Sequence, residues 1–71
     1  MDRATIRALL KKAHRSQSNV QQASQIIVQI RDVAGEEKQN SLEKVIVEWR
    51  ISGEPVNDEV VEQIYRLQQG E

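Results

Sequence analysis

The fold of this chain depends on one segment, Val45–Ile51, which has the sequence VIVEWRI. Its apolar residues alternate with Glu48 and Arg50, as in a half-buried strand, and its β-branched residues also favour a strand. Leu42, Ile46 and Trp49, however, recur at the spacing of one helical face. The periodicity of the segment therefore fits both a helix and a strand.

The rest of the chain favours the helix. The related sequence IIVQIR at 26–31 could pair with 45–51, but an isolated two-stranded hairpin is marginally stable in water. The remaining residues offer only two short helices to cover such a hairpin. We therefore predict an all-α fold, a small antiparallel helical bundle of three to four short helices, forming a single helical domain over residues 1–71. The alternative is an α-β-β-α fold with a hairpin from 26–31 and 45–51.

Two helices are predicted before this segment. Apolar residues recur every three or four positions over 3–16 and again over 19–34. Ser18 and Gln21 have the spacing of a capping box, which predicts the start of the second helix. Gly35 stands where a left-handed residue commonly ends a helix, so we expect the second helix to end there.

The third element and the last helix are bounded by turn-forming residues. We expect the third element to begin at Asn40 or Ser41, which are good N-caps, and to end before Pro55, which restricts the residue preceding it. The last helix is predicted to run from the N-cap Asn57 to Gly70, with carboxylates in its first turn, where they meet the positive end of the helix dipole.

The small size of the chain favours association. It has 71 residues, no cysteine and 3% aromatic residues, and chains below roughly 70–80 residues seldom gain more than ~3–5 kcal/mol from one core. We expect Trp49 at the centre of this core. Because the core is small, we also allow for a homodimer formed through the second helix. The predicted dimer seam comprises Val20, Ala23, Ile27, Ile30 and Ala34.

No catalytic, metal or cofactor site is predicted. His14 is the only histidine and has no carboxylate within the same helical turn, whereas a zinc site needs three or four ligands and a catalytic triad needs a positioned nucleophile. The three glycines are too scattered to form a phosphate-binding loop. We expect a protein that is not an enzyme and that carries no cofactor.

Nothing in the sequence predicts contact with a membrane. The longest apolar run, Ile26–Val28, is far shorter than the ~20 residues that span a bilayer. The first residues also lack the apolar core of a secretory signal. A cytoplasmic location is the expectation.

Charge is distributed unevenly along the chain. Residues 1–18 have a net charge of +4 and residues 19–71 a net charge of −5. Most of the early cations are spaced three or four residues apart, so they share one edge of the predicted first helix. The predicted partner-binding face of this helix comprises Arg3, Arg7, Lys11, His14 and Arg15.

This basic face could meet the acidic last helix, an acidic protein or nucleic acid. The overall charge of −1 and the absence of a recognisable helix-turn-helix spacing argue against nucleic acid. We predict a protein–protein interaction module, such as an adaptor, inhibitor or regulatory subunit, that binds a larger protein. The alternative is a transcriptional regulator that contacts nucleic acid through its basic N-terminal helix.

Overall fold

Four α-helices make up the protein in the computed structural model, which describes residues 1–70. Three short connections join them. The helices are α1 (Arg3–Arg15), α2 (Val20–Arg31), α3 (Glu36–Ser52) and α4 (Asp58–Gln68).

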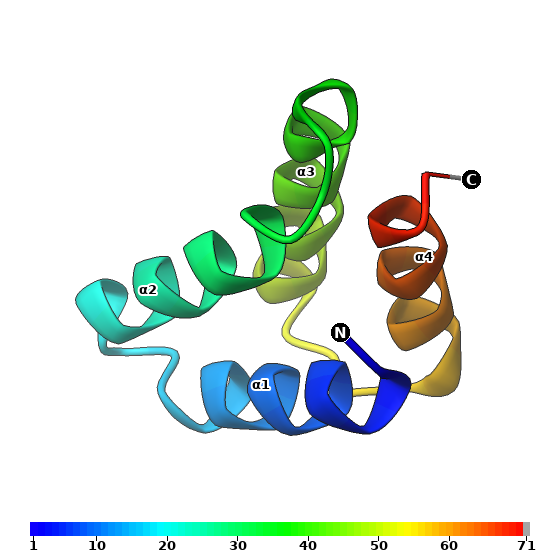
Figure 1. The fold of residues 1–71 in the computed structure, drawn as a ribbon. Coiled ribbons are helices and arrows are strands. Elements are labelled where there is room, and N and C mark those ends of the chain that lie inside the picture. Colours follow the sequence, from blue (N-terminus) through cyan, green and yellow to red (C-terminus); the bar gives the residue numbers. More distant parts are fainter. Residues whose placement is uncertain (71) are drawn as a thin grey trace.

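The helices form a closed ring of contacts. In Figure 1, α2 runs back above α1, while α3 and α4 stand next to each other with opposite chain directions. Both α1 and α3 pack against α2 and α4, so each helix has two main neighbours. This arrangement confirms the predicted all-α helical bundle.

The ambiguous segment Val45–Ile51 is helical and lies within α3. Within 1–70 there is no strand, and the alternative hairpin is wrong because 26–31 belongs to α2. Burial explains the outcome. A strand would bury Val47 and Ile51 on the same face as Trp49, but their side chains are 37% and 80% exposed. The three- to four-residue period is therefore the one that matches the core.

The core is aliphatic and is drawn from all four helices. Trp49 is its one aromatic member and is 7% exposed, as predicted. Its indole nitrogen donates a hydrogen bond to the Pro55 carbonyl at 3.4 Å, which ties α3 to the loop before α4. The buried hydrophobic residues are Ile6, Leu10, Ala13, Ala23, Ile26, Ile30, Ala34, Leu42, Ile46, Trp49, Val60, Val61 and Ile64.

The start of α2 differs from the prediction by one residue. The N-cap is Asn19 rather than Ser18, and its side-chain oxygen accepts a hydrogen bond from the Gln22 backbone N–H at 3.0 Å. Both residues are good N-caps, so the predicted capping box located the start of the helix but chose a cap one residue too early. The helix ends at Arg31, three residues earlier than expected.

The junction between α2 and α3 was also predicted incorrectly. Gly35 has φ −64° and ψ 155°, so it is not left-handed, and it is the N-cap of α3 rather than the end of α2. The third helix begins at Glu36, several residues before Asn40 and Ser41. Glu36 and Glu37 occupy its first turn, where carboxylates interact favourably with the helix dipole.

The last helix begins at the predicted N-cap and ends at Gln68, two residues before Gly70, which has φ +83°. Asn57 caps α4 by accepting a hydrogen bond from the Val60 backbone N–H at 2.9 Å. Gly53 ends α3 with φ +73°, a left-handed conformation that favours glycine. Over the described residues, no helix combines the length and apolar character needed to cross a bilayer.

Candidate partner-binding site

The first helix places its apolar and basic residues on adjoining faces. Asp2 caps α1 by accepting a hydrogen bond from the Thr5 backbone N–H at 2.8 Å. Hydrogen bonding by Thr5, through its side chain and then its backbone, lowers the pKa of Asp2. The helix buries Ile6, Leu10 and Ala13. The predicted basic face therefore lies at the edge of the core rather than over it.

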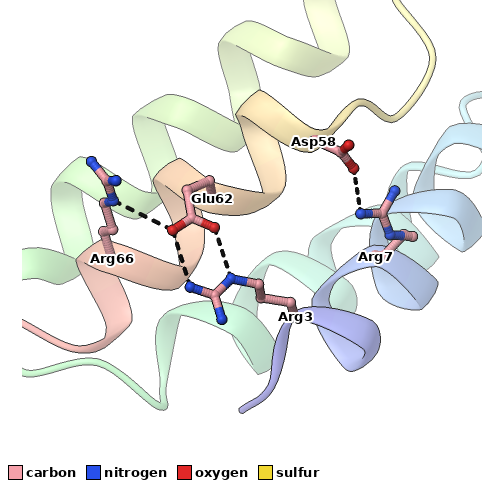
Figure 2. Close-up of polar contacts among 5 residues, drawn as sticks. All are labelled: Arg3, Arg7, Asp58, Glu62 and Arg66. Atoms are coloured by element: carbon pink, nitrogen blue, oxygen red, sulfur yellow. Dashed lines mark hydrogen bonds and ion pairs between the residues drawn. The ribbon is translucent and has the colours of Figure 1, made fainter.

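The first half of the basic face is paired with α4 (Figure 2). Arg3 donates from Nε and Nη2 to the two carboxylate oxygens of Glu62, at 2.7 and 3.1 Å, and its guanidinium carbon lies 3.9 Å from the centre of the Tyr65 ring. Arg7 forms an ion pair with Asp58. Pairing of α1 with the acidic last helix, one of the three alternatives for the basic face, therefore forms within one chain.

The register of this pairing also explains where it stops. Arg3 and Arg7 are four residues apart, as are Asp58 and Glu62, and the pairs are antiparallel. One further step would bring Lys11 to Glu54, but α4 begins only at Asp58. The row of ion pairs between α1 and α4 therefore ends at Arg7, and within residues 1–70 no carboxylate forms an ion pair with Lys11 or Arg15.

The ion pairs make the charge state of Glu62 part of the stability of the fold. The hydrogen bond from Arg3 lowers the pKa of Glu62, and the positive charges of Arg3 and Arg66 lower it further. Arg66 lies on the other side of the same carboxylate, with its Nε 3.4 Å from Oε1. The ionised form of Glu62 is thus favoured in the folded chain.

We expect Glu62→Gln to reduce the pH dependence of the free energy of unfolding. Because the folded pKa is depressed, the contribution of Glu62 is fully present above its ordinary value of 4.5 and is lost as the pH falls through the folded value. Urea unfolding of both proteins should show a stability difference at neutral pH that disappears in acid. Glu48→Gln, at an exposed position with no ion pair inside 1–70, is the matched control. Parallel pH profiles for wild type and Glu62→Gln would contradict this assignment.

The second half of the basic face borders a pocket. Lys11, His14 and Arg15 line a hollow of about 230 Å³ together with Pro55 and Val56 of the α3–α4 loop. We call these five residues the α1 pocket. Three side chains that can carry positive charge thus border a wall of proline and valine.

The cations beside the α1 pocket have no internal partner. Within residues 1–70, Lys11, Lys12 and Arg15 form no ion pair, in contrast to Arg7 on the same helix. The pocket therefore presents uncompensated positive charge.

His14 connects the α1 pocket to the core. Its ring is 6.1 Å from the Trp49 ring, centre to centre, and tilted by 40°. Gln17 lies 3.5 Å from its Nδ1. Because Trp49 is the only tryptophan, its fluorescence can report on ligands that contact His14.

The predicted dimer seam on α2 does not form an open face. Ala23, Ile30 and Ala34 belong to the chain's own core, and Ile27 is half-buried against it. Val20 is 69% exposed. The ring of helices buries the side of α2 centred on Ile26 and Ile30, so most of the seam packs against helices of the same chain, and Val20 lies outside this buried side.

Sequence reasoning missed the loop side of the pocket. Pro55 was interpreted only as a helix boundary, and Val56 was not singled out. One signal was present, since Val56 precedes the cap Asn57 and so occupies the position of a hydrophobic staple. The structure packs Val56 against the core, which holds the loop next to α1.

A second hollow lies on the other side of this loop. It has a volume of about 380 Å³ between α3 and α4, and the acidic residues Glu48, Glu54 and Glu59 are among those that line it. The loop thus separates a basic hollow from an acidic one. Among the described residues, no group of three or more His, Cys, Asp or Glu could hold a metal ion.

Comparisons with protein-family models, curated proteins and solved structures found no match to this chain. Functional inference therefore depends on the geometry of the site itself.

Proposed function

We propose that this protein is a non-enzymatic binding module that holds an acidic segment of a larger protein at the α1 pocket. The observation that carries the proposal is the uncompensated charge of Lys11 and Arg15 beside the apolar wall of Pro55 and Val56. A carboxylate can pair with the cations while a neighbouring apolar side chain contacts the wall. Such a module would act as an adaptor, inhibitor or regulatory subunit.

The size of the α1 pocket supports a peptide side chain as the ligand. Its volume of about 230 Å³ is below the roughly 300–1,000 Å³ that is typical of small-molecule sites. A charged rim around an apolar patch is also common at protein–protein interfaces.

The distribution of charge favours a protein over nucleic acid. Nucleic acid is bound along an extended basic stripe that neutralises several phosphates. Here Arg3 and Arg7, which would begin such a stripe, already pair with Glu62 and Asp58. The positive charge that remains on α1 is confined to the last turns of the helix, next to the α1 pocket.

We expect short peptides in which Glu alternates with Leu to bind and to change the fluorescence of Trp49, which contacts His14. Lys11→Glu should weaken this binding by about tenfold or more, because hydrogen bonds to charged groups contribute about 1.5–3 kcal/mol. Lys12→Glu is the matched control. It gives the same net charge on the same helix, but Lys12 does not line the pocket, so its effect should be small.

Three ligands and one capture experiment separate the alternatives. Peptides with Gln in place of Glu and inorganic phosphate should bind poorly. A single-stranded oligonucleotide that binds more tightly than the acidic peptide, with steep salt dependence and equal sensitivity to Lys11→Glu and Lys12→Glu, would favour the nucleic-acid alternative.

Capture from lysate tests the same site with a natural partner. A protein partner bound to the wild-type chain should stay bound after nuclease treatment, and it should fail to bind only when the Lys11→Glu variant is used. Equal loss from both variants would count against the α1 pocket.

A further inference from the structure

The exposed face of α2 has no charged residue. Residues 16–30 contain neither an acidic nor a basic side chain, although 30% of the chain is charged. The side of this helix that points away from the core carries only valine, glutamine and serine. We call this surface the α2 outer face, and its exposed residues are Val20, Gln21, Ser24, Gln25, Val28 and Gln29.

The α2 outer face is open to solvent. The surface around Gln21, Ser24, Gln25, Val28 and Gln29 is bordered by residues of α2 alone. Val20 is 69% exposed and Val28 is 39% exposed, so two apolar side chains of one helix face water. Nothing else in residues 1–70 covers them.

The residues of this face form two rows, one symmetric about Ser24 and the other about the adjacent Gln25. Val20, Ser24 and Val28 are four residues apart and form one row along the helix. Gln21, Gln25 and Gln29 form a second row beside it. Reversing the direction of α2 about Ser24 therefore places valine opposite valine, and reversing it about Gln25 places glutamine opposite glutamine.

We propose that the α2 outer face binds the same face of a second copy of this chain, with the two α2 helices antiparallel across a two-fold axis near Ser24. Val20 of each copy then faces Val28 of the other, and the small Ser24 side chains allow the helices to approach to the usual 8–10 Å or so. This surface differs from the predicted seam, with which it shares only Val20.

Charge and hydrogen bonding both favour a second copy as the occupant. In a two-fold interface each residue near the axis meets itself, so charged side chains there repel. An amide side chain both donates and accepts hydrogen bonds, so glutamine pairs with glutamine without a charge penalty. The absence of charge between 16 and 30 avoids this repulsion, and it offers no attraction for a strongly charged partner.

The contact is small, and this sets the concentration at which the dimer forms. The face from Val20 to Gln29 is about 15 Å long, and one helix pair buries less than the roughly 1,200–2,000 Å² of a standard stable interface. We therefore expect a weak dimer. Sedimentation equilibrium from micromolar to millimolar protein should show the average mass rising from 8.2 kDa towards twice that value.

Charge substitutions at Ser24 test the symmetry directly. Ser24→Glu and Ser24→Lys should each weaken self-association by about tenfold or more, because like charges then meet on the axis. An equimolar mixture of the two variants should restore association, because opposite charges then face each other. Ser41→Glu, at an exposed serine of α3, is the matched control and should associate as the wild type does.

Several results would overturn the proposal. The first is that the wild-type chain stays monomeric at millimolar concentration. The second is that Ser24→Glu associates like the wild type. The third is that the mixture of Ser24→Glu and Ser24→Lys stays monomeric. Circular dichroism of the variants shows whether each one is folded. Ser24→Glu should leave peptide binding at the α1 pocket unchanged, so the two surfaces can fail or succeed independently.

Discussion

Trp49→Ala should leave the chain largely unfolded at neutral pH. Trp49 is 7% exposed and is the one large aromatic residue in an otherwise aliphatic core. Removing a buried tryptophan side chain costs about 3–5 kcal/mol, and a domain of this size gains about that much from its whole core. We expect the helical circular dichroism signal and the cooperative urea transition both to be lost.

Trp49→Phe separates the packing of the ring from its hydrogen bond. Phenylalanine keeps most of the apolar contact but cannot donate to the Pro55 carbonyl, which Trp49 does at 3.4 Å. That loss should cost about 1 kcal/mol, so Trp49→Phe should fold with a lower melting temperature. A Trp49→Ala protein that unfolds cooperatively within about 1 kcal/mol of the wild type would contradict the central role of Trp49 in the core.

Helices were predicted well where caps and spacing agreed. Asn57 is the N-cap of α4 because its side chain accepts from the backbone three residues later, and this spacing can be recognised in the sequence. The start of α3 was missed because residues 36–41 are polar and show no apolar period. Residues 36–41 are helical because Glu36 and Glu37 interact favourably with the positive end of the helix dipole, and because the segment continues into the buried part of α3.

The candidate site was predicted only in part, for a reason of distance along the chain. The spacing of Arg3, Arg7 and Lys11 correctly placed them along one helix, since that is a local property. Which of them meet a carboxylate depends on how α1 crosses α4, more than 50 residues away in sequence. Only the structure shows that the pairing ends after Arg7 and leaves Lys11 beside the α3–α4 loop.

Aspartate substitutions at two adjacent isoleucines of α2 should have very different effects on the stability of the fold. Ile26→Asp should unfold the protein, because Ile26 is 2% exposed and an aspartate there would be a buried charge without a partner. Such a charge costs several kcal/mol, which is comparable to the whole stability of a small domain. Ile27→Asp should cost less, about 1–2 kcal/mol, because Ile27 is only half-buried and the carboxylate can reach water.

This pair of variants also tests the orientation of α2. The sequence Ile26-Ile27-Val28 is apolar at three consecutive positions, so periodicity alone did not show which of them faces the core. The predicted seam used Ile27, and on that basis Ile27→Asp would disrupt a dimer or unfold the chain. The structure instead centres the buried side on Ile26 and Ile30 and turns Val28 to solvent.

Urea unfolding of both variants, followed by circular dichroism, decides between these orientations. Loss of the folded state in Ile26→Asp with a cooperative transition retained in Ile27→Asp would support the burial described here. The reverse order of stability would mean that α2 is rotated so that Ile27 faces the core, and Val28 would then turn away from solvent. Because the proposed two-fold contact needs Val28 at the surface, the same measurement tests the foundation of the dimer.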